Sequence, residues 1–378
     1  MRVMVSCGEP SGDVYAGALA TEIAARIPSA EIFGLGSDRL RAAGGRLVGD
    51  FKGISVTGLT EAIRVLPRSY AMLRRLVDAA RATRPDVFVA IDFPDFNFRL
   101  MAALHRLGIR IVYYVSPQLW AWRPGRMRTM KRFVDRVLVI FPFEEPLYRR
   151  EGVDVLFVGH PLVDLARPLE PRDVFLRAHG LDPALPTVAV LPGSRPNEVH
   201  RILPGLAAAV PQIRIKVSDV QFVVACAPNL VEAQFASLRD IRPEPPVLVW
   251  NRTDDVLASS DVVVTASGTA TVQAALHERP MVVVYRLSPL TYALGRPFVK
   301  VDTYAMANLV AGHRVVPELI QEEFTPERVT RETVALLTDR DRWTATRDAL
   351  RDVRTKLGKP GASGRAADAV LEVATRDL

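Results

Sequence analysis

The sequence lacks the features of a secreted or membrane-spanning protein. Only Cys7 and Cys226 occur among 378 residues, each inside an apolar run, which favours two buried thiols in a reducing compartment over a disulfide. The amino-terminal stretch MRVMVSCGEPSGD turns polar too early for a signal peptide. No apolar run reaches the roughly 18 residues that a membrane-spanning helix needs. These absences predict a cytoplasmic protein whose membrane contact is peripheral.

The sequence also has few groups that would bind a metal. Its six histidines are scattered, and no His, Cys, Asp and Glu cluster has metal-ligand spacing. His160, between Gly159 and Pro161, is expected to stabilise a domain junction rather than to titrate in catalysis. We therefore expect no metal and no cofactor.

Composition points to a folded protein with anionic partners. Hydrophobic residues make up 49% and charged residues 24%, and the length suits two domains. The formal net charge is +7, which favours phosphates, nucleic acid or an acidic membrane surface. Charge alone does not choose among these.

Short apolar runs alternate with helical patterns along almost the whole chain. Most of the runs lack polar alternation, as in strands buried on both faces of a parallel sheet. The alternation predicts two doubly wound α/β domains of Rossmann type that face each other across a cleft. The predicted strands are Arg2–Cys7, Glu31–Gly34, Val87–Asp92, Arg110–Val115, Arg136–Phe141, Val155–Val158, Thr187–Leu191, Gln221–Ala225, Val247–Trp250, Asp261–Thr265 and Met281–Tyr285.

A proline-rich stretch, Gly159–Arg172, is predicted as the interdomain linker. The expected domains are residues 1–165 and 166–355. A helical segment, 356–378, is expected to pack back on the first domain or to exchange with a partner chain.

Two small-residue turns in the second domain are candidate phosphate sites. One is Pro192-Gly193-Ser194-Arg195 and the other is Ser267-Gly268-Thr269; each follows a strand and precedes a helix. Backbone N–H groups and a helix N-terminus attract phosphate there, and Arg195 adds a charged fork. The simpler interpretation of each is an ordinary strand-to-helix turn. Neither matches a dinucleotide or P-loop motif, which argues against an oxidoreductase or NTPase.

The first domain offers carboxylates instead. Glu9 and Ser11 lie in the turn Gly8–Asp13, which suits a sugar or acceptor hydroxyl, although Ser11 or Asp13 can equally cap the next helix. Asp92 ends a buried strand, where partial desolvation would raise its basicity, and Asp95 follows a proline turn. Asp92 as a general base with Asp95 as a helix cap is one assignment. The reverse, or two structural caps, stays open.

Two further features point to an amphipathic ligand or surface. Trp120 and Arg123 belong to a stretch of tryptophans and arginines that suits a greasy, phosphorylated molecule. In a helix around residues 67–84, one stripe is apolar (Leu66, Tyr70, Leu73, Val77) and Arg64, Arg68 and Arg75 lie on the opposite side. Val65, Met72 and Leu76 widen the apolar face, and cations dominate the rest. The simpler interpretation is a helix packed on the sheet. The alternative is a helix lying on anionic lipid.

Taken together, these segments resemble the lipid-A-disaccharide synthases over essentially the whole chain. The order and spacing of the matching motifs carry the resemblance: GEPSGD (8–13), AIDFPDFN (90–97), YVSPQLWAWR (114–123), FVGHP (157–161), LPGSR (191–195), ASGT (266–269), PMVVVYR (280–286) and NLVAG (308–312). The resemblance implies a GT-B fold and an inverting transfer. UDP-2,3-diacylglucosamine would react with 2,3-diacylglucosamine 1-phosphate to give a β-1,6-linked disaccharide and UDP, on the inner face of the inner membrane of a Gram-negative bacterium.

The resemblance also assigns roles to residues. Asp92 corresponds to the proposed general base and Arg195 to an essential diphosphate-contacting arginine. Asn308 would touch UDP, and Ser267, Gly268 and Thr269 would receive phosphate or ribose. Gln273 departs from the family, which commonly has a glutamate able to meet the ribose hydroxyls. The family's dimers with exchanged C-terminal segments imply a possible homodimer.

Two other functions compete with this one. A UDP-N-acetylglucosamine 2-epimerase shares the two-domain fold but needs no greasy acceptor wall. A basic nucleic-acid-binding protein would spread cations and aromatics along a stripe. Here they cluster near Trp120 and on one amphipathic helix, so no nucleic-acid partner is expected.

Overall fold

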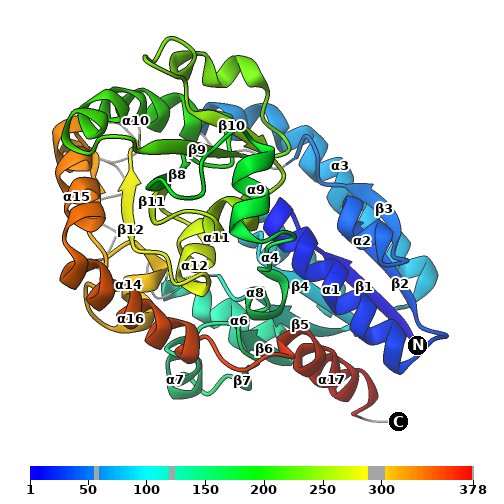
Figure 1. The fold of residues 1–378 in the computed structure, drawn as a ribbon. Coiled ribbons are helices and arrows are strands. Elements are labelled where there is room, and N and C mark those ends of the chain that lie inside the picture. Colours follow the sequence, from blue (N-terminus) through cyan, green and yellow to red (C-terminus); the bar gives the residue numbers. More distant parts are fainter. Residues whose placement is uncertain (55–58, 118, 120–123, 288–302, 377–378) are drawn as a thin grey trace. The chain divides into compact units, whose positions relative to one another are not determined.

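The computed structural model describes residues 1–54, 59–117, 119, 124–287 and 303–376, without the side chains of residues 59–65. The chain forms two compact units (Figure 1). The first comprises Met1–Pro161 with Leu357–Leu378, and the second comprises Leu162–Lys356. The chain passes between them at Pro161, inside the stretch predicted as a linker, where the short helix α8 (Leu162–Leu165) follows at once.

The first unit is built on a seven-stranded parallel sheet in the order β3-β2-β1-β4-β5-β6-β7. The strands predicted from apolar runs are present, with ends that shift by up to two residues. Only β3 was missed, because its sequence RLVGD is short and polar at both ends. The strands are β1 (Arg2–Ser6), β2 (Glu31–Gly36), β3 (Arg46–Asp50), β4 (Val87–Ile91), β5 (Arg110–Tyr114), β6 (Arg136–Val139) and β7 (Val155–Phe157).

Most helices of this unit alternate with its strands along the chain, and one more is supplied by the C-terminal segment. They are α1 (Pro10–Arg26), α2 (Asp38–Ala42), α3 (Leu59–Thr83), α4 (Pro94–His105), α6 (Met127–Phe133), α7 (Glu144–Arg150) and α17 (Ala362–Thr375). Helix α17 packs against α1 and beside β4 and β5 (Figure 1). Its acidic side chains pair with this unit's cations, Asp368 with Arg26 at 2.5 Å and Glu372 with Arg136 at 2.7 Å.

The second unit has a six-stranded parallel sheet in the order β10-β9-β8-β11-β12-β13. Its strands are β8 (Thr187–Leu191), β9 (Gln221–Cys226), β10 (Val247–Trp250), β11 (Val262–Ala266), β12 (Met281–Tyr285) and β13 (Glu318–Ile320). Five of them were predicted, whereas the three residues of β13 are too few to show a pattern. Besides α8, the described helices of this unit are α9 (Arg172–Ala178), α10 (Pro196–Lys216), α11 (Thr253–Ala258), α12 (Thr269–Leu276), α14 (Met306–Ala311), α15 (Pro326–Thr338) and α16 (Arg340–Lys356).

Each sheet is buried on both faces, which explains why its strands read as continuous apolar runs. Every residue of β4, β8 and β11 is buried. Val188, Val190, Val262 and Val264 pack with helix α10 in one apolar core. Burial of this kind, at roughly 25 cal/mol for each Å² of apolar surface, is the main favourable term for such a domain. The two parallel-sheet α/β domains predicted from the sequence are therefore confirmed.

The strand order places one reversal point in each sheet. In the first, β1 and β4 are neighbours and the chain winds away from them in opposite directions; β8 and β11 have this relation in the second. Ligands of open α/β sheets bind at the carboxyl ends of the strands that flank such a point. The turns of Gly8, Asp92, Gly193 and Gly268 follow these four strands, so the topology brings them together in pairs within each unit.

The amphipathic helix differs from its predicted orientation. The inward face of α3 carries Leu76 and Ala80, both fully buried, and Met72, whose sulfur packs over Gly49 of β3. Leu66 and Tyr70 remain 49% and 54% exposed, so the predicted packed stripe was wrong for these two residues. No helix in the described part of the chain has the length and apolar content needed to cross a bilayer.

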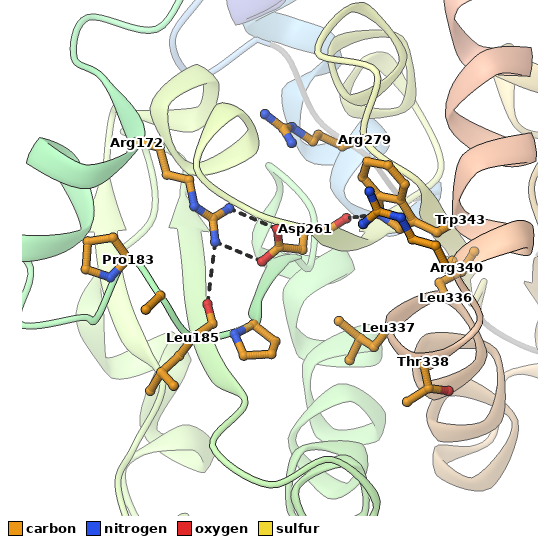
Figure 2. Close-up of a pocket in the computed structure, with 12 residues that line it drawn as sticks. Arg172, Pro183, Leu185, Asp261, Arg279, Leu336, Leu337, Thr338, Arg340 and Trp343 are labelled. Atoms are coloured by element: carbon orange, nitrogen blue, oxygen red, sulfur yellow. Dashed lines mark hydrogen bonds and ion pairs between the residues drawn. The ribbon is translucent and has the colours of Figure 1, made fainter.

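A cavity of about 520 Å³ lies at the opposite, amino-terminal end of the second sheet. Several of its polar groups pair with one another, as Figure 2 shows: the Arg172 guanidinium donates to both carboxylate oxygens of Asp261, at 3.1 and 2.9 Å, and Arg340 lies over the Trp343 ring. The Trp343 indole donates to the Asp261 carbonyl at 3.0 Å. This network ties α9, β11 and α16 together, and we interpret it as structural.

His160 is buried at the end of the first unit, between the rings of Tyr15 and Phe141. Burial lowers the pKa of its imidazole to about 3. In the unfolded chain this imidazole takes up a proton at about pH 6.5, whereas in the folded chain it stays neutral. The free energy of unfolding therefore falls as the pH drops below about 6.5, by about 1.4 kcal/mol for each pH unit.

We predict that His160→Gln flattens this dependence. The urea midpoint of the wild-type protein should fall as the pH is lowered from about 6.5 to about 5, before carboxylates titrate. The midpoint of the variant should fall less over the same range, because the contribution of His160 is missing. His200→Gln, at an exposed position, is the matched control and should keep the wild-type slope. Equal slopes for the wild type and His160→Gln would show that His160 is protonated in the folded state.

Candidate active site

The first phosphate-competent turn of the second unit is held by Glu198. Gly193 has φ of 125°, and a Cβ atom there would lie 2.7 Å from that of Glu198, so only glycine fits. The Glu198 carboxylate accepts the backbone N–H of Ser194 at 3.1 Å and the Arg195 Nη1 at 3.0 Å. The Asn229 side chain donates to the Ser194 carbonyl at 2.9 Å. The turn between β8 and α10 is thus fixed before any ligand binds.

Arg195 is the residue immediately before α10, and a third of its side chain is exposed. Tyr285, the last residue of β12, lies in the same electrostatic environment. Burial raises the pKa of the Tyr285 hydroxyl, the charge of Glu198 raises it further, and Arg195 and Arg201 oppose the shift. Sequence reasoning missed Tyr285 as a site residue, although its place at the end of a buried strand was the available signal.

The second turn joins β11 to α12. Gly268 has φ of 144° and is exposed, as is Thr269, the first residue of the helix. Ser267 differs from our expectation: its hydroxyl donates to the Tyr304 carbonyl at 3.0 Å and its N–H donates to the Val284 carbonyl. Ser267 therefore braces the turn, which leaves Gly268 and Thr269 as the residues open to a ligand.

The two turns begin side by side. Strands β8 and β11 pair in parallel, with Leu191 opposite Thr265, so the residues that follow them share one edge of the sheet. The N-termini of α10 and α12 both lie at this edge, and each has N–H groups that lack an intrahelical acceptor. Together with Arg195 they make an edge that suits a diphosphate.

Asn308 has a different role from the nucleotide contact that the resemblance implied. It is 1% exposed. Its Nδ2 donates to the Glu318 carboxylate at 2.7 Å and to the Val316 carbonyl at 3.0 Å, and its Oδ1 accepts the N–H groups of Val315 and Val316. Because all four hydrogen-bonding positions are used, Asn308 fixes the loop after α14.

Glu318 extends that network toward the second turn. Its carboxylate accepts the N–H groups of Tyr304 and Ala305, each at 2.9 Å, at the start of α14. The carbonyl of Tyr304 in turn accepts the Ser267 hydroxyl. A buried acid on β13 therefore holds the segment on which Ser267 rests, a connection that the sequence did not reveal.

Gln273 lies one helical turn into α12. Its Nε2 donates to Oδ1 of Asp254 on α11 at 3.2 Å, and the same oxygen is 2.9 Å from Nε2 of His277. The side-chain nitrogen of Gln273 is thus occupied within the unit.

In the first unit, Asp92 follows β4 in a strained backbone. Asp92 and Phe93 have φ of 46° and 50°, and Val115, after the neighbouring β5, has φ of 59°. Left-handed conformations are uncommon for residues other than glycine and gather at functional sites. The Asp92 carbonyl accepts hydrogen bonds from the Tyr113 hydroxyl and the Asn97 amide, both at 2.8 Å.

Gly8 and Asn97 explain how this strain is maintained. A Cβ atom at Gly8 would lie 2.2 Å from the Phe93 ring, so the ring occupies space that only glycine leaves open. The buried Asn97 amide also bonds with Ser6 at the end of β1. The loops after β1 and β4 are therefore interlocked at the reversal point of the sheet.

Asp92 and Asp95 are in different environments. Asp92 is partly buried at the strand end, whereas Asp95 lies in the first turn of α4 with an exposed side chain that pairs with Arg126. Helix α4 begins at Pro94 with Phe93 at the N-cap position, so Asp95 lies inside the first turn of the helix. The expectation that Asp95 caps the helix was wrong.

The turn Gly8–Asp13 also differs from expectation at one residue. Helix α1 begins at Pro10, so Glu9 precedes it and Ser11 lies in its first turn, both partly buried. Asp13 is buried and caps another helix: its carboxylate accepts the N–H groups of Ser37, Arg39 and Leu40 at the start of α2. The two remaining candidates of this region, Trp120 and Arg123, lie outside the described residues.

The fold and these turns define the class of protein. Two parallel-sheet α/β domains, with a phosphate-competent edge in the second, are typical of GT-B enzymes that act on nucleotide sugars. Solved structures share this fold. The chain is similar to a putative UDP-N-acetylglucosamine 2-epimerase from Listeria monocytogenes (TM-score 0.66, 14% identity, 98% and 96% of the two chains covered) and to the calicheamicin glycosyltransferase CalG4 (0.62, 18%, 100% and 99%). At these identities the likeness shows the fold alone.

Sequence relatives identify the family. The family profile described as lipid-A-disaccharide synthetase matches residues 3–373. Proteins named lipid-A-disaccharide synthase from Myxococcus xanthus and Koribacter versatilis are 42% and 43% identical to this chain, over 98% and 100% of its length and 97% and 99% of theirs. The chain belongs to the lipid-A-disaccharide synthase family, and it is a glycosyltransferase.

Proposed function

We propose that this chain transfers a diacylglucosamine unit from UDP-2,3-diacylglucosamine to 2,3-diacylglucosamine 1-phosphate. The products are UDP and the β-1,6-linked disaccharide 1-phosphate, a precursor of lipid A. The observation that carries the proposal is the paired edge of β8 and β11 with Arg195, in a chain whose relatives of similar length carry this name.

The second unit supplies the groups that would bind the donor. A guanidinium has five N–H donors, so Arg195 can meet a diphosphate while Nη1 stays with Glu198. The N-termini of α10 and α12 add partial positive charge at the same edge. Negative charge grows on the diphosphate as UDP leaves, and these groups stabilise it more in the transition state than in the ground state. They can serve the role that a metal ion has in other transferases.

The first unit supplies the base. In the proposed step, the acceptor 6-hydroxyl oxygen attacks the anomeric carbon of the donor, on the face opposite UDP. The bond from that carbon to the UDP oxygen breaks, the new carbon–oxygen bond forms, and the hydroxyl proton passes to the Asp92 carboxylate. The hydrogen bonds to the Asp92 carbonyl and the interlocked Gly8 and Phe93 support this assignment, because they fix the backbone of the base.

Two competing functions have less support. The structural likeness to 2-epimerases covers the fold but not the sequence family, which is that of the disaccharide synthases. A nucleic-acid-binding protein would not need the ordered turns of Gly193 and Gly268.

We predict that Asp92→Asn lowers turnover by about 10²–10⁴-fold, the usual contribution of a general base. Arg195→Ala should lower it by about 10²–10³-fold through loss of charge stabilisation, and Arg195→Lys should recover only part of it. The assay incubates both substrates and measures the disaccharide product by mass spectrometry.

Asp38→Asn, which removes an exposed carboxylate of the same unit, is the matched control and should stay within a few-fold of the wild type. Asp95→Asn separates the two candidate bases. Loss of activity in Asp95→Asn with near-normal activity in Asp92→Asn would reverse the assignment. A sugar epimer in place of a disaccharide would reject the proposed reaction.

We also propose that α3 contacts an anionic membrane, which would place the protein peripherally on the inner face of the inner membrane. Leu66 and Tyr70 are exposed large apolar side chains, and Arg68, Arg74 and Arg75 are exposed beside them. Arg74 lies over the Tyr70 ring at 4.6 Å, so charge and apolar surface are adjacent. Such a face suits the boundary between headgroups and acyl chains.

Removing this surface should weaken binding to vesicles that contain phosphatidylserine. In a sedimentation assay at low salt, the combined variant Leu66→Ser and Tyr70→Ser should lower the bound fraction several-fold. Ile215→Ser, at an 81% exposed position on α10, is the matched control. Binding that is unchanged in the α3 variant, or absent in the wild type, would contradict the proposal.

A homodimer with exchanged C-terminal segments is a further proposal. Helix α17 joins α16 through a short connection in which Gly358 and Gly361 have φ of 100° and 91°. The pairs Arg26–Asp368 and Arg136–Glu372 would form equally well between two copies. Light scattering should then give twice the chain mass of 41.7 kDa at micromolar concentration. The mass of a single chain at all concentrations would exclude the dimer.

A further inference from the structure

We propose that Asp254 orients Gln273 so that the side-chain carbonyl of Gln273 accepts a hydrogen bond from a ribose hydroxyl of the nucleotide. Asp254 is then a positioning residue for the ribose contact that the family resemblance implies at position 273. The inference rests on the proposed function, because it needs a nucleoside diphosphate at the edge formed by β8 and β11.

The geometry involves two neighbouring helices. Helices α11 and α12 contact each other in the second unit (Figure 1). Oδ1 of Asp254 lies 3.2 Å from Nε2 of Gln273 and 2.9 Å from Nε2 of His277. The Asp254 and His277 side chains are 23% and 8% exposed. The three side chains thus form a compact polar cluster behind the second phosphate-competent turn.

Chemistry fixes which end of the Gln273 amide faces Asp254. An ionised carboxylate only accepts hydrogen bonds, so the NH₂ group of the amide must point toward it. The other end, Oε1, is then an acceptor that faces away from Asp254. Without Asp254, the amide could rotate and present either end to a ligand.

Gln273 lies where the ribose of a bound nucleotide is expected. Thr269 and Gln273 are four residues apart on α12, so they lie on the same face, one turn of about 5.4 Å from each other. If the diphosphate lies at Thr269, the next part of the nucleotide along this face is the ribose. Its two hydroxyls are donors, and an oriented carbonyl is the partner they need.

The cluster also explains why an amide is present at position 273. A glutamate there would place its carboxylate about 3.2 Å from that of Asp254, in the contact that Nε2 now makes. Two carboxylates this close cannot both stay ionised without a large penalty. Gln273 offers the same acceptor to the ribose without adding a negative charge near the diphosphate.

The experiment compares UDP with 2′-deoxy-UDP and 3′-deoxy-UDP by isothermal titration calorimetry. The wild-type protein should bind UDP about 10-fold more tightly than at least one deoxy analogue, which corresponds to about one hydrogen bond. In Asp254→Ala this preference should fall to less than about threefold, while the affinity for the deoxy analogue stays close to that of the wild type. A merely structural role would lower both affinities alike.

Exchanging the two groups gives an independent test. Gln273→Glu alone should weaken UDP binding, because it creates the carboxylate pair. Asp254→Asn combined with Gln273→Glu should restore both the affinity and the preference for UDP, because the amide at position 254 then donates to the carboxylate at 273. Retention of the preference in Asp254→Ala, no preference in the wild type, or no recovery in the double variant would each overturn the inference.

These outcomes are separable from failure of the proposed function. Wild-type protein that binds UDP but makes no disaccharide would reject the reaction while leaving the ribose contact measurable. Disaccharide formation with an unchanged deoxy preference in Asp254→Ala would reject only the inference.

Discussion

The parallel pairing of β8 with β11 is the constraint on which the proposed donor site depends. Leu191 lies opposite Thr265, and this register alone brings two turns more than 70 residues apart in the chain to one edge. Parallel strands require a crossover between neighbours, so every turn that follows a strand falls on the same side of the sheet. The position of the phosphate-competent edge is therefore set by the topology, and the turn residues supply the groups that suit it to phosphate.

Buried or partly buried carboxylates hold the loops around the candidate site. Glu198 accepts the N–H of Ser194, Glu318 accepts those of Tyr304 and Ala305, and Asp13 accepts three at the start of α2. Hydrogen bonds to an ionised acceptor are stronger than those between neutral groups. Acids near the candidate site thus have two separate uses, and only Asp92 is assigned to chemistry.

Sequence reasoning recovered the parts of the molecule that local pattern determines. Buried strands such as β4 and β11 are continuous apolar runs, and small residues after them mark the turns, so the two sheets and the turns of Gly193 and Gly268 could be predicted. The partners of a side chain are set by tertiary contacts instead. Nothing near Asp13 in the chain indicates that it caps α2, and nothing near Asn308 indicates that Glu318 and Val316 saturate its amide. Likewise, the sequence does not distinguish Leu66 from Leu76, which are equally apolar. Tertiary packing buries Leu76 and leaves Leu66 49% exposed.

The interlocked loops of Gly8 and Phe93 have a consequence for the proposed role of Asp92 as the base. Because the ring of Phe93 fills the space beside Gly8 and the carbonyl of Asp92 is tied to Tyr113 and Asn97, the backbone at Asp92 has little freedom left to lose. The entropy of ordering this segment was spent when the chain folded. In the proposed reaction the acceptor would therefore meet a preorganised carboxylate, and its binding energy would serve to align its own hydroxyl. Any side chain at position 8 would displace the ring. The segment would then have to be ordered when the acceptor binds.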